Sequence, residues 1–416
     1  MAQIQSLGGV FVLLGLCWLI SENRRAVSVK DAATGLAVTF ATALLLLKAP
    51  VVAQSFGVIN AAVEGIAAAT KAGTSFVFGH IGGGQTPFDL KNPGANFSLA
   101  FQALPVVLVV SALTTLLFYW RILPPIVSAF SWLLGRTMNV SGAVGLSTAA
   151  NIFLGMVEAP LFIKPYIGRL TRCELFMVMT GGMAGIAGTV FVLYSIFLKP
   201  AIPDASGHLL IASILSAPAA LLIARIMVPE TEHARGSSAE AQIPPVATST
   251  MDAIVRGTAA GLELLWSIIA MMIVLVALVW IVNALLGLFP QFQGAAITMQ
   301  RVLGWLMAPI CWLMGIPWGE ATIAGSLMGT KTVLNEFLAY LDLAALPKDV
   351  MSDRTRLIML YAMCGFANFA SLGIMIAGLC GMCPERRNEI VSLGPMTIVS
   401  GTLTTCLMAA IVGVLV

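Results

Sequence analysis

Asn151-Ile-Phe-Leu-Gly-Met-Val-Glu-Ala-Pro160 and Gly329-Thr-Lys-Thr-Val-Leu-Asn-Glu-Phe-Leu-Ala-Tyr340 each place one glutamate inside an apolar stretch of this chain. The two glutamates are Glu158 and Glu336. A carboxylate at membrane depth is costly, so its default interpretation is a functional one. These two stretches therefore indicate both a membrane protein and the position of its site.

A glycine-rich segment interrupts an apolar helix about 30 residues after each glutamate. The first is Gly181-Gly-Met-Ala-Gly-Ile-Ala-Gly188, and the second is Cys364-Gly-Phe-Ala-Asn-Phe-Ala-Ser371. The spacing is common to both halves, because Val190 follows Glu158 by 32 residues and Asn368 follows Glu336 by 32. Two such units in corresponding halves indicate inverted repeats and the binding site of a secondary transporter.

Composition supports an all-α polytopic membrane protein. Of the 416 residues 59% are hydrophobic and 10% are charged, and apolar runs long enough to span a bilayer as helices recur along the chain. The net charge of +3 is too small to suggest a nucleic-acid partner. Cys380 and Cys383 form a lone C-x-x-C and the three His residues lie far apart, so neither a zinc site nor a cofactor is expected.

The apolar runs predict about eight transmembrane helices. They are expected at about 7–21, 32–50, 97–120, 173–197, 207–228, 256–288 and 356–379, with an eighth after Arg387. Residues 51–96 are rich in small residues and are expected to form a turn-rich outer loop. Arg24 and Arg25 follow the first apolar run, which favours a retained first span with the N-terminus outside. Eight spans then place the C-terminus outside as well.

Four further segments do not fit simple spans. Residues 121–136 are amphipathic with Arg at both ends, as in an interfacial helix. Residues 142–163 and 319–345 hold the two glutamates and are predicted to be opposed re-entrant hairpins, one entering from each side. Residues 290–318 are a mixed amphipathic stretch on the outer side.

The chain is therefore expected to be one integral membrane transporter, 1–416, built from five segments. These are N-terminal spans that are largely scaffold (1–120), the interfacial helix with the first hairpin, broken fourth span and fifth span (121–228), a polar cytoplasmic linker (229–252), a sixth span with an outer amphipathic helix, also scaffold (253–318), and the second hairpin with the broken seventh span and the eighth (319–416).

The two glutamate motifs, together with Gly365-Phe-Ala-Asn-Phe-Ala-Ser371, resemble the signatures of the concentrative nucleoside transporter family. The similarity in order and spacing covers nearly the whole chain. It implies a nucleoside:cation symporter in the inner membrane of a bacterium. It also implies a homotrimer whose transport domain moves like an elevator against a scaffold.

The resemblance assigns the nucleobase side to the first hairpin. By position it offers Gly155, Met156, Val157 and Glu158 to the base, with Val190 contributing from the fourth span. The family pattern there is usually Gly-Gln-Thr-Glu, so two hydrogen-bonding side chains are replaced by apolar ones. Base discrimination should weaken, and purines or a different solute become more plausible ligands.

The ribose side matches the family without a departure. It consists of Glu336, Asn368 and Ser371, with Phe366 packing nearby. A carboxylate can accept hydrogen bonds from both vicinal hydroxyls of ribose, an amide both donates and accepts, and serine adds a hydroxyl.

The cation side departs from the family at one position. The family's sodium site would use Asn151, the carbonyls of Leu154 and Ile186, and a serine hydroxyl where this chain has Gly185. Sodium prefers several hard oxygen ligands, so the loss makes proton coupling competitive. Glu158 or Glu336 would carry the proton, and the sequence favours protons slightly over sodium.

Two other functions stay open at this stage. One is symport of a different small polar solute, suggested by Met156 and Val157. The other is an intramembrane hydrolase that uses the two carboxylates as an acid/base pair, although no nucleophile or metal motif accompanies them. A transporter without enzymatic activity is the preferred interpretation.

Overall fold

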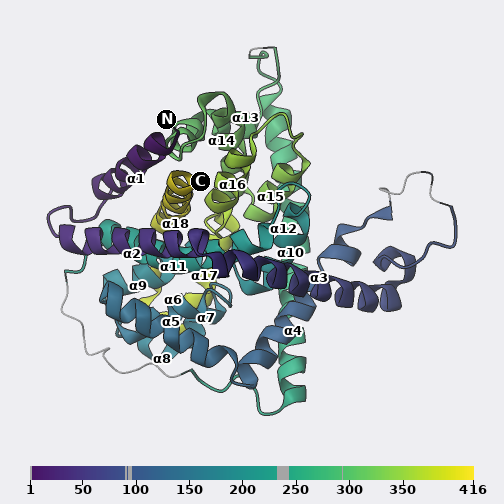
Figure 1. The fold of residues 1–416 in the computed structure, drawn as a ribbon, viewed down its shortest axis with the longest axis horizontal. Helices are drawn as coiled ribbons and strands as arrows, with labels where there is room; N and C mark the ends of the chain where they lie inside the picture. The colour runs from purple at the N-terminus through teal and green to yellow at the C-terminus, as the bar shows by residue number, and fades with distance from the viewer. Residues whose placement is uncertain (1, 90, 92–95, 232–242, 293) are drawn as a thin grey trace.

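The computed structural model describes residues 2–89, 91, 96–231, 243–292 and 294–416, and their regular structure is helical (Figure 1). The exception is one isolated antiparallel bridge between Phe292 and Ala295. Part of the predicted linker, 232–242, lies outside the described residues. An all-helical membrane fold is therefore confirmed.

Within the described residues, seven segments are long and apolar enough to cross a membrane. They are α1 (Ala2–Leu19), α2 (Val29–Lys48), a π-helical turn (Leu99–Ala103) with α4 (Val106–Tyr119), the pair α9 (Arg172–Ala184) and α10 (Gly188–Leu198), α11 (Ala205–Met227), α12 (Thr250–Leu286), and α18 (Arg387–Leu415) with the short helix before it. A second broken pair, α16 (Asp353–Met363) and the shorter apolar α17 (Phe369–Met382), occupies the place of the predicted seventh span.

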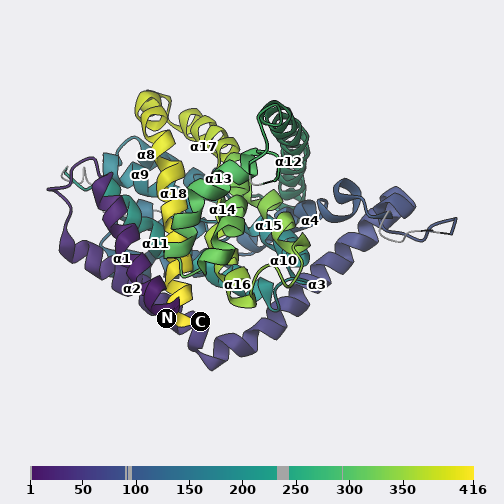
Figure 2. The same ribbon diagram turned by 90° about the horizontal axis from the view of Figure 1, so that it is seen from above.

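The predicted outer loop at 51–96 is wrong over most of its length. Residues Pro50–Phe78 form α3, a helix of 29 residues that projects from the body as an arm (Figures 1 and 2). Its sequence is rich in alanine, glycine and serine and carries the charged residues Glu64 and Lys71. Alanine is the best helix former, so abundant small residues do not indicate a loop here.

Both predicted hairpins consist of helices joined by a short turn. In the first, α6 (Gly142–Ala150) leads through a non-helical turn to the one-turn helices α7 (Glu158–Leu161) and α8 (Lys164–Ile167). In the second, α14 (Trp318–Val333) is followed by α15 (Glu336–Ala345). The expected interfacial helix is α5 (Leu123–Met138). The outer amphipathic stretch contains α13 (Met299–Leu313), which is bent against α14 by 119°.

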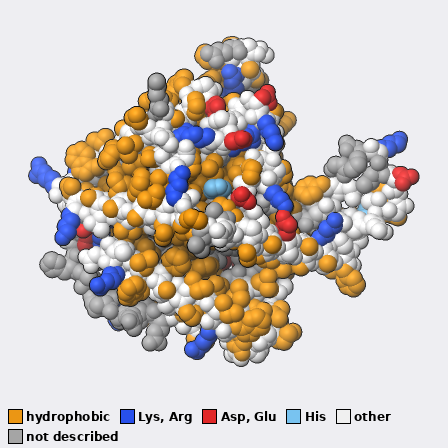
Figure 3. Space-filling model, viewed as in Figure 1, with side chains coloured by type: hydrophobic (Ala, Val, Ile, Leu, Met, Phe, Trp, Pro, Cys, Tyr) orange, Lys and Arg blue, Asp and Glu red, His pale blue; other side chains and the backbone are white. Residues whose placement is uncertain are grey.

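The centre of the molecule is formed by α9, α11 and α18, each of which has most of its residues buried. Helix α1 packs on α18, and α2 packs on α11. Both termini lie on the same side (Figure 2), where Arg354 donates to Ser6 Oγ (3.4 Å) near one end and to the Gly413 carbonyl (2.5 Å) near the other. The face shown in Figure 3 is largely apolar, with charged side chains scattered over its upper half and along its edges.

Helix α12 stands apart from this centre and packs chiefly on α4. The two helices approach closely at two glycines. A Cβ on Gly257 would lie 2.6 Å from Ala112 Cα, and one on Gly261 would lie 2.9 Å from Leu108 Cα. Small residues that allow backbones to meet are typical of helix contacts in membranes. Helices α4 and α12 therefore form a tightly joined pair.

Candidate functional site

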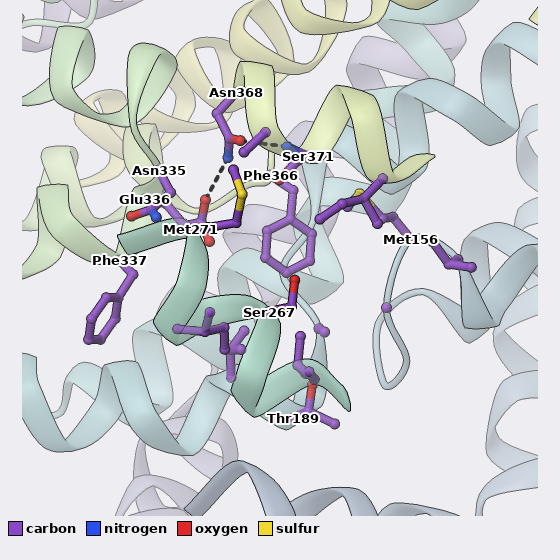
Figure 4. A pocket seen from close by; sticks show the side chains of 18 of the residues that line it. Met156, Thr189, Ser267, Met271, Asn335, Glu336, Phe337, Phe366, Asn368 and Ser371 are labelled. Carbon is purple, nitrogen blue, oxygen red and sulfur yellow. Dashed lines mark hydrogen bonds between the residues drawn. The ribbon is translucent and has the colours of Figure 1, made fainter. Parts of the chain in front are cut away.

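A cavity lies where the tips of both hairpins meet both helix breaks, with α12 as its remaining wall (Figure 4). Every residue that the sequence assigned to the substrate lines it. These residues are Gly155, Met156, Val157 and Glu158 from the first hairpin, Val190 from α10, Glu336 from the second hairpin, and Phe366, Asn368 and Ser371 from the second break. The structure thus brings together segments more than 200 residues apart in the chain.

Three helix N-termini converge on the cavity. Helix α10 begins after Ala187, α15 begins after Asn335, and α17 begins after Asn368, and all three of these preceding residues line the cavity. Asn335 Oδ1 accepts from Leu338 N (2.9 Å), and Asn368 Oδ1 accepts from Ser371 N (2.8 Å), so both asparagines are N-caps. The positive ends of helices stabilise nearby carboxylates, which reduces the cost of placing acids here.

Glu336 is held through both of its carboxylate oxygens. Tyr194 donates its hydroxyl to Oε1 at 2.6 Å, and Asn368 donates its amide to Oε2 at 3.0 Å. All three side chains are buried. Figure 4 shows the bond between Asn368 and Glu336 at the cavity wall. Since each carboxylate oxygen has a second lone pair, the group remains able to accept two hydrogen bonds from a ligand.

The two helix breaks contact each other directly. Phe366 donates its backbone N–H to the carbonyl of Gly185 at 3.2 Å. Gly365 permits this crossing, because a Cβ there would lie 2.7 Å from the carbonyl oxygen of Ala184. The two broken helices that line the cavity are therefore joined through their backbones.

The first hairpin presents an apolar surface beside one acid. Met156 is buried against Gly182 of α9, where a Cβ would be only 3.0 Å from Met156 Cβ. Val157 packs in the same way on Gly378 of α17. Glu158 is exposed, and its Oε2 would lie 2.2 Å from a Cβ on Gly155, so the carboxylate folds back over that glycine. The Glu158 carboxylate therefore lies over the backbone of its own turn, whereas that of Glu336 is held by side chains from two other segments.

Several lining residues were not predicted from the sequence. Helix α12 contributes Leu264, Ser267, Ile268 and Met271 as one wall. Tyr194 is the most informative omission. It follows Val190 by four residues on α10, and that i,i+4 spacing places both on one face of the helix.

Two of the residues expected to bind a cation, Asn151 and Ile186, lie next to Gly185. Asn151 donates its amide to the Gly181 carbonyl (2.9 Å), and its Nδ2 would lie 2.8 Å from a Cβ on Gly185. Ser216 of α11 places its Oγ 3.2 Å from the same point. A hydroxyl from another helix thus lies next to the position where the family's serine is missing.

A second hydroxyl near this point has no hydrogen-bond partner among the described residues. It belongs to Thr148 on α6 and lies 3.8 Å from a Cβ built on Gly181. Buried polar atoms normally have partners, so an unpartnered hydroxyl beside Asn151 is consistent with a bound cation or water.

Comparison with known proteins identifies the family. Residues 208–413 match the family model described as Na+ dependent nucleoside transporter C-terminus, and residues 8–81 match the corresponding N-terminus. Residues 100–201 match the model described as nucleoside recognition. Together these models span most of the chain.

Full-length relatives agree with this result. An uncharacterized transporter of Haemophilus influenzae is 35% identical over 100% of this chain and 98% of the relative. The nucleoside permease NupC of Helicobacter pylori is 32% identical over 100% of this chain and 98% of the relative. Sodium/nucleoside cotransporter 1 of Mus musculus is 31% identical over 99% of this chain and 64% of the relative. The chain belongs to the Na+-dependent nucleoside transporter family, whose members are transporters rather than enzymes, so the hydrolase alternative is wrong.

Solved structures show the same fold. The transporter CNTnw in an inward-facing substrate-bound state has a TM-score of 0.90 at 33% identity, covering 100% of this chain and 98% of that chain. An outward-facing variant of CNTnw also gives a TM-score of 0.90 at 33% identity, with the same coverage. The chain is therefore confirmed as a concentrative nucleoside transporter by fold as well as by sequence.

Proposed function

We propose that this protein imports nucleosides by symport with a cation, and that the cavity described above is its substrate site. The observation that carries the proposal is the Glu336 network. A carboxylate whose two oxygens are oriented by Tyr194 and Asn368 is a suitable acceptor for the two vicinal hydroxyls of ribose. The nine lining residues assigned by resemblance act as its substrate contacts.

We propose sodium as the coupling cation, in place of the proton that sequence reasoning slightly favours. Ser216 Oγ lies close to the point where a Gly185 side chain would begin, so it can replace the missing family hydroxyl. Asn151 and the carbonyls of Leu154 and Ile186 would complete a set of hard oxygen ligands of the kind sodium prefers. The carboxylate of Glu158 then contacts the nucleobase and does not carry the coupling proton.

Substitution of Ser216 tests this assignment. Ser216→Ala should raise the sodium concentration needed for half-maximal nucleoside binding, because one oxygen ligand is lost. Gly185→Ser combined with Ser216→Ala should restore the sodium affinity by moving the hydroxyl to the other helix. If sodium has no effect on wild-type binding at constant pH while acidification does, protons are the coupling ion instead.

The surroundings of the cavity support an elevator-type movement. Helices α4 and α12 form a pair that is tightly packed at Gly257 and Gly261, and α12 supplies only an apolar wall and Ser267 to the cavity. In this proposal the pair belongs to the static scaffold, and the hairpins with their broken helices move along it. We also propose a homotrimer in a bacterial inner membrane with both termini outside.

The direct test is uptake of labelled uridine into proteoliposomes under separate sodium and pH gradients. Accumulation driven by an inward sodium gradient at equal pH would support the proposal, and accumulation driven only by a pH gradient would refute sodium coupling. If neither labelled uridine nor a labelled purine nucleoside is taken up under either gradient, a different small polar solute becomes the better proposal. The apolar pair Met156 and Val157 is the feature that favours this alternative.

A further inference from the structure

Lys331 is a fully buried cation that the substrate and cation sites described above do not use. It lies in the last turn of α14, in the second hairpin, and its side chain is 0% exposed. Its Nζ donates to the carbonyl of Ala362 at 3.0 Å and to Thr405 Oγ1 at 2.9 Å. Burying an ammonium group is expensive, so its position requires a partner of opposite charge or an equivalent dipole.

The equivalent dipole is the end of the broken helix α16. Ala362 is the second-last residue of α16, immediately before the break that carries Asn368. The carbonyls at a helix C-terminus carry partial negative charge. Tyr340, also in the second hairpin, donates its hydroxyl to the neighbouring carbonyl of Leu360 at 2.9 Å. The second hairpin thus caps the interrupted helix with a cation and a hydroxyl.

The first repeat has the same arrangement without the charge. There the hairpin residue is Asn151, which donates to the carbonyl of Gly181 near the end of the broken helix α9. The two contacts span 30 and 31 residues respectively, and each joins the end of a hairpin helix to the end of a broken helix. They match in place but not in exact register, because Asn151 precedes Glu158 by seven residues and Lys331 precedes Glu336 by five. A neutral amide stands in the first repeat where an ammonium stands in the second.

We propose that Lys331 is a tethered cation that fills, in the second repeat, the position that a mobile coupling cation takes in the first. This proposal rests on the cation symport proposed above. Lys331 neutralises the end of α16 and joins the second hairpin, which also carries Glu336, to α16 and α18 through its bonds to Ala362 and Thr405. It is a positioning residue for Glu336, and it limits cation dependence to the first repeat.

Removal of the tether should create a new cation requirement. We would purify Lys331→Ala in detergent and measure equilibrium binding of labelled uridine with N-methylglucamine, sodium, ammonium or methylammonium as the only monovalent cation. Coupling between two sites commonly changes affinity by about 5- to 150-fold, so a loss in that range is expected for Lys331→Ala. Ammonium or methylammonium, entering the space that the side chain leaves, should restore binding in a saturable manner.

Two variants separate this role from a purely structural one. Arg356→Met removes another buried cation of α16, whose guanidinium donates to the carbonyls of Met351, Leu343, Leu346 and Pro347. That variant should lower thermal stability without changing uridine affinity. Lys331→Met keeps the volume and removes the charge, so it should lose affinity without rescue by ammonium.

A second measurement does not depend on nucleoside binding. Methylammonium should raise the melting temperature of Lys331→Ala more than that of the wild type. Conversely, Asn151→Lys should make uridine binding independent of sodium, because it supplies a tethered cation to the first repeat. This variant tests the proposal even if the Lys331 variants fail to fold.

Three outcomes would overturn the tethered-cation proposal. They are wild-type uridine affinity in a folded Lys331→Met, failure of every monovalent cation to restore binding or stability to Lys331→Ala, and unchanged sodium dependence in a folded Asn151→Lys. Absence of uridine binding by the wild type would instead refute the proposed function, and the melting-temperature comparison would still decide the role of Lys331.

Discussion

Replacement of Tyr194 by phenylalanine is expected to weaken nucleoside binding by about tenfold, because it removes one of the two groups that orient Glu336. The hydroxyl of Tyr194 donates to Glu336 Oε1 at 2.6 Å in a buried environment. Phenylalanine keeps the ring, so the contacts with Phe337 and Tyr340 at centroid distances of 6.0 and 5.1 Å should persist. The change therefore isolates the hydroxyl.

The magnitude follows from the chemistry of this bond. A hydrogen bond to a charged group contributes about 1.5–3 kcal/mol, and about 1.4 kcal/mol corresponds to a factor of ten in affinity. Asn368 still holds the other oxygen of Glu336 at 3.0 Å, so the carboxylate stays at the cavity wall with more freedom. We therefore expect the lower end of this range.

The assay is a comparison of ribonucleoside and dideoxynucleoside binding. Uridine should lose about tenfold in affinity to Tyr194→Phe, whereas 2′,3′-dideoxyuridine, which lacks both hydroxyls that Glu336 would accept from, should lose little. Tyr340→Phe is the matched control. Its hydroxyl donates to the Leu360 carbonyl instead of Glu336, so it should lower thermal stability without changing the ratio of the two affinities.

Two results would refute this reasoning. Wild-type uridine affinity in Tyr194→Phe would mean that the bond to Glu336 does not orient the substrate site. An equal loss for uridine and for dideoxyuridine would mean that the substitution acts on the shape of the cavity and that Glu336 does not bind ribose.

Three further substitutions test other parts of the cavity. Glu336→Gln should abolish detectable uridine binding, since a charged acceptor is lost; wild-type affinity in a binding assay would exclude the ribose role. Met156→Gln with Val157→Thr should sharpen the preference among nucleobases in a competition assay, and an unchanged profile would place the base elsewhere. Gly261→Leu should reduce stability by about 1–3 kcal/mol, as overpacking of a core does, because even a Cβ there would lie 2.9 Å from Leu108 Cα; an unchanged melting temperature would mean that α4 and α12 are not tightly joined.

The substrate-facing residues could be predicted because they lie at places with strong local signals. Glu158 and Glu336 stand out in apolar sequence, and Asn368 lies within a glycine-containing break in an apolar helix. These positions are at helix starts in the structure. The same signals located both hairpins and both broken helices, since each depends on neighbours within one motif.

The residues that were missed depend on contacts between distant segments. Leu264 and Met271 of α12 look like any apolar span in the sequence, and only packing shows that they face the cavity. Ser216 illustrates the same limit more sharply. The lost hydroxyl at Gly185 was visible in the sequence, but its neighbour on α11 is 31 residues further along and no local pattern connects the two.

The two repeats differ in how many of their polar groups are already paired within the protein. In the second repeat Glu336 is bonded through both oxygens and Lys331 occupies the helix end. In the first, Glu158 is exposed, and the unpartnered hydroxyl of Thr148 lies beside the Asn151 contact.

One turn of the first hairpin serves both ligands under the proposed function. Asn151 and Leu154 would bind the cation, and residues 155–158, which follow directly, line the substrate cavity. A cation that orders the first part of this turn would also order the second. The conformational entropy of the turn is then lost when the cation binds and is not lost again when the nucleoside binds. Positive cooperativity between cation and nucleoside then follows from the covalent continuity of the turn, without direct contact between them.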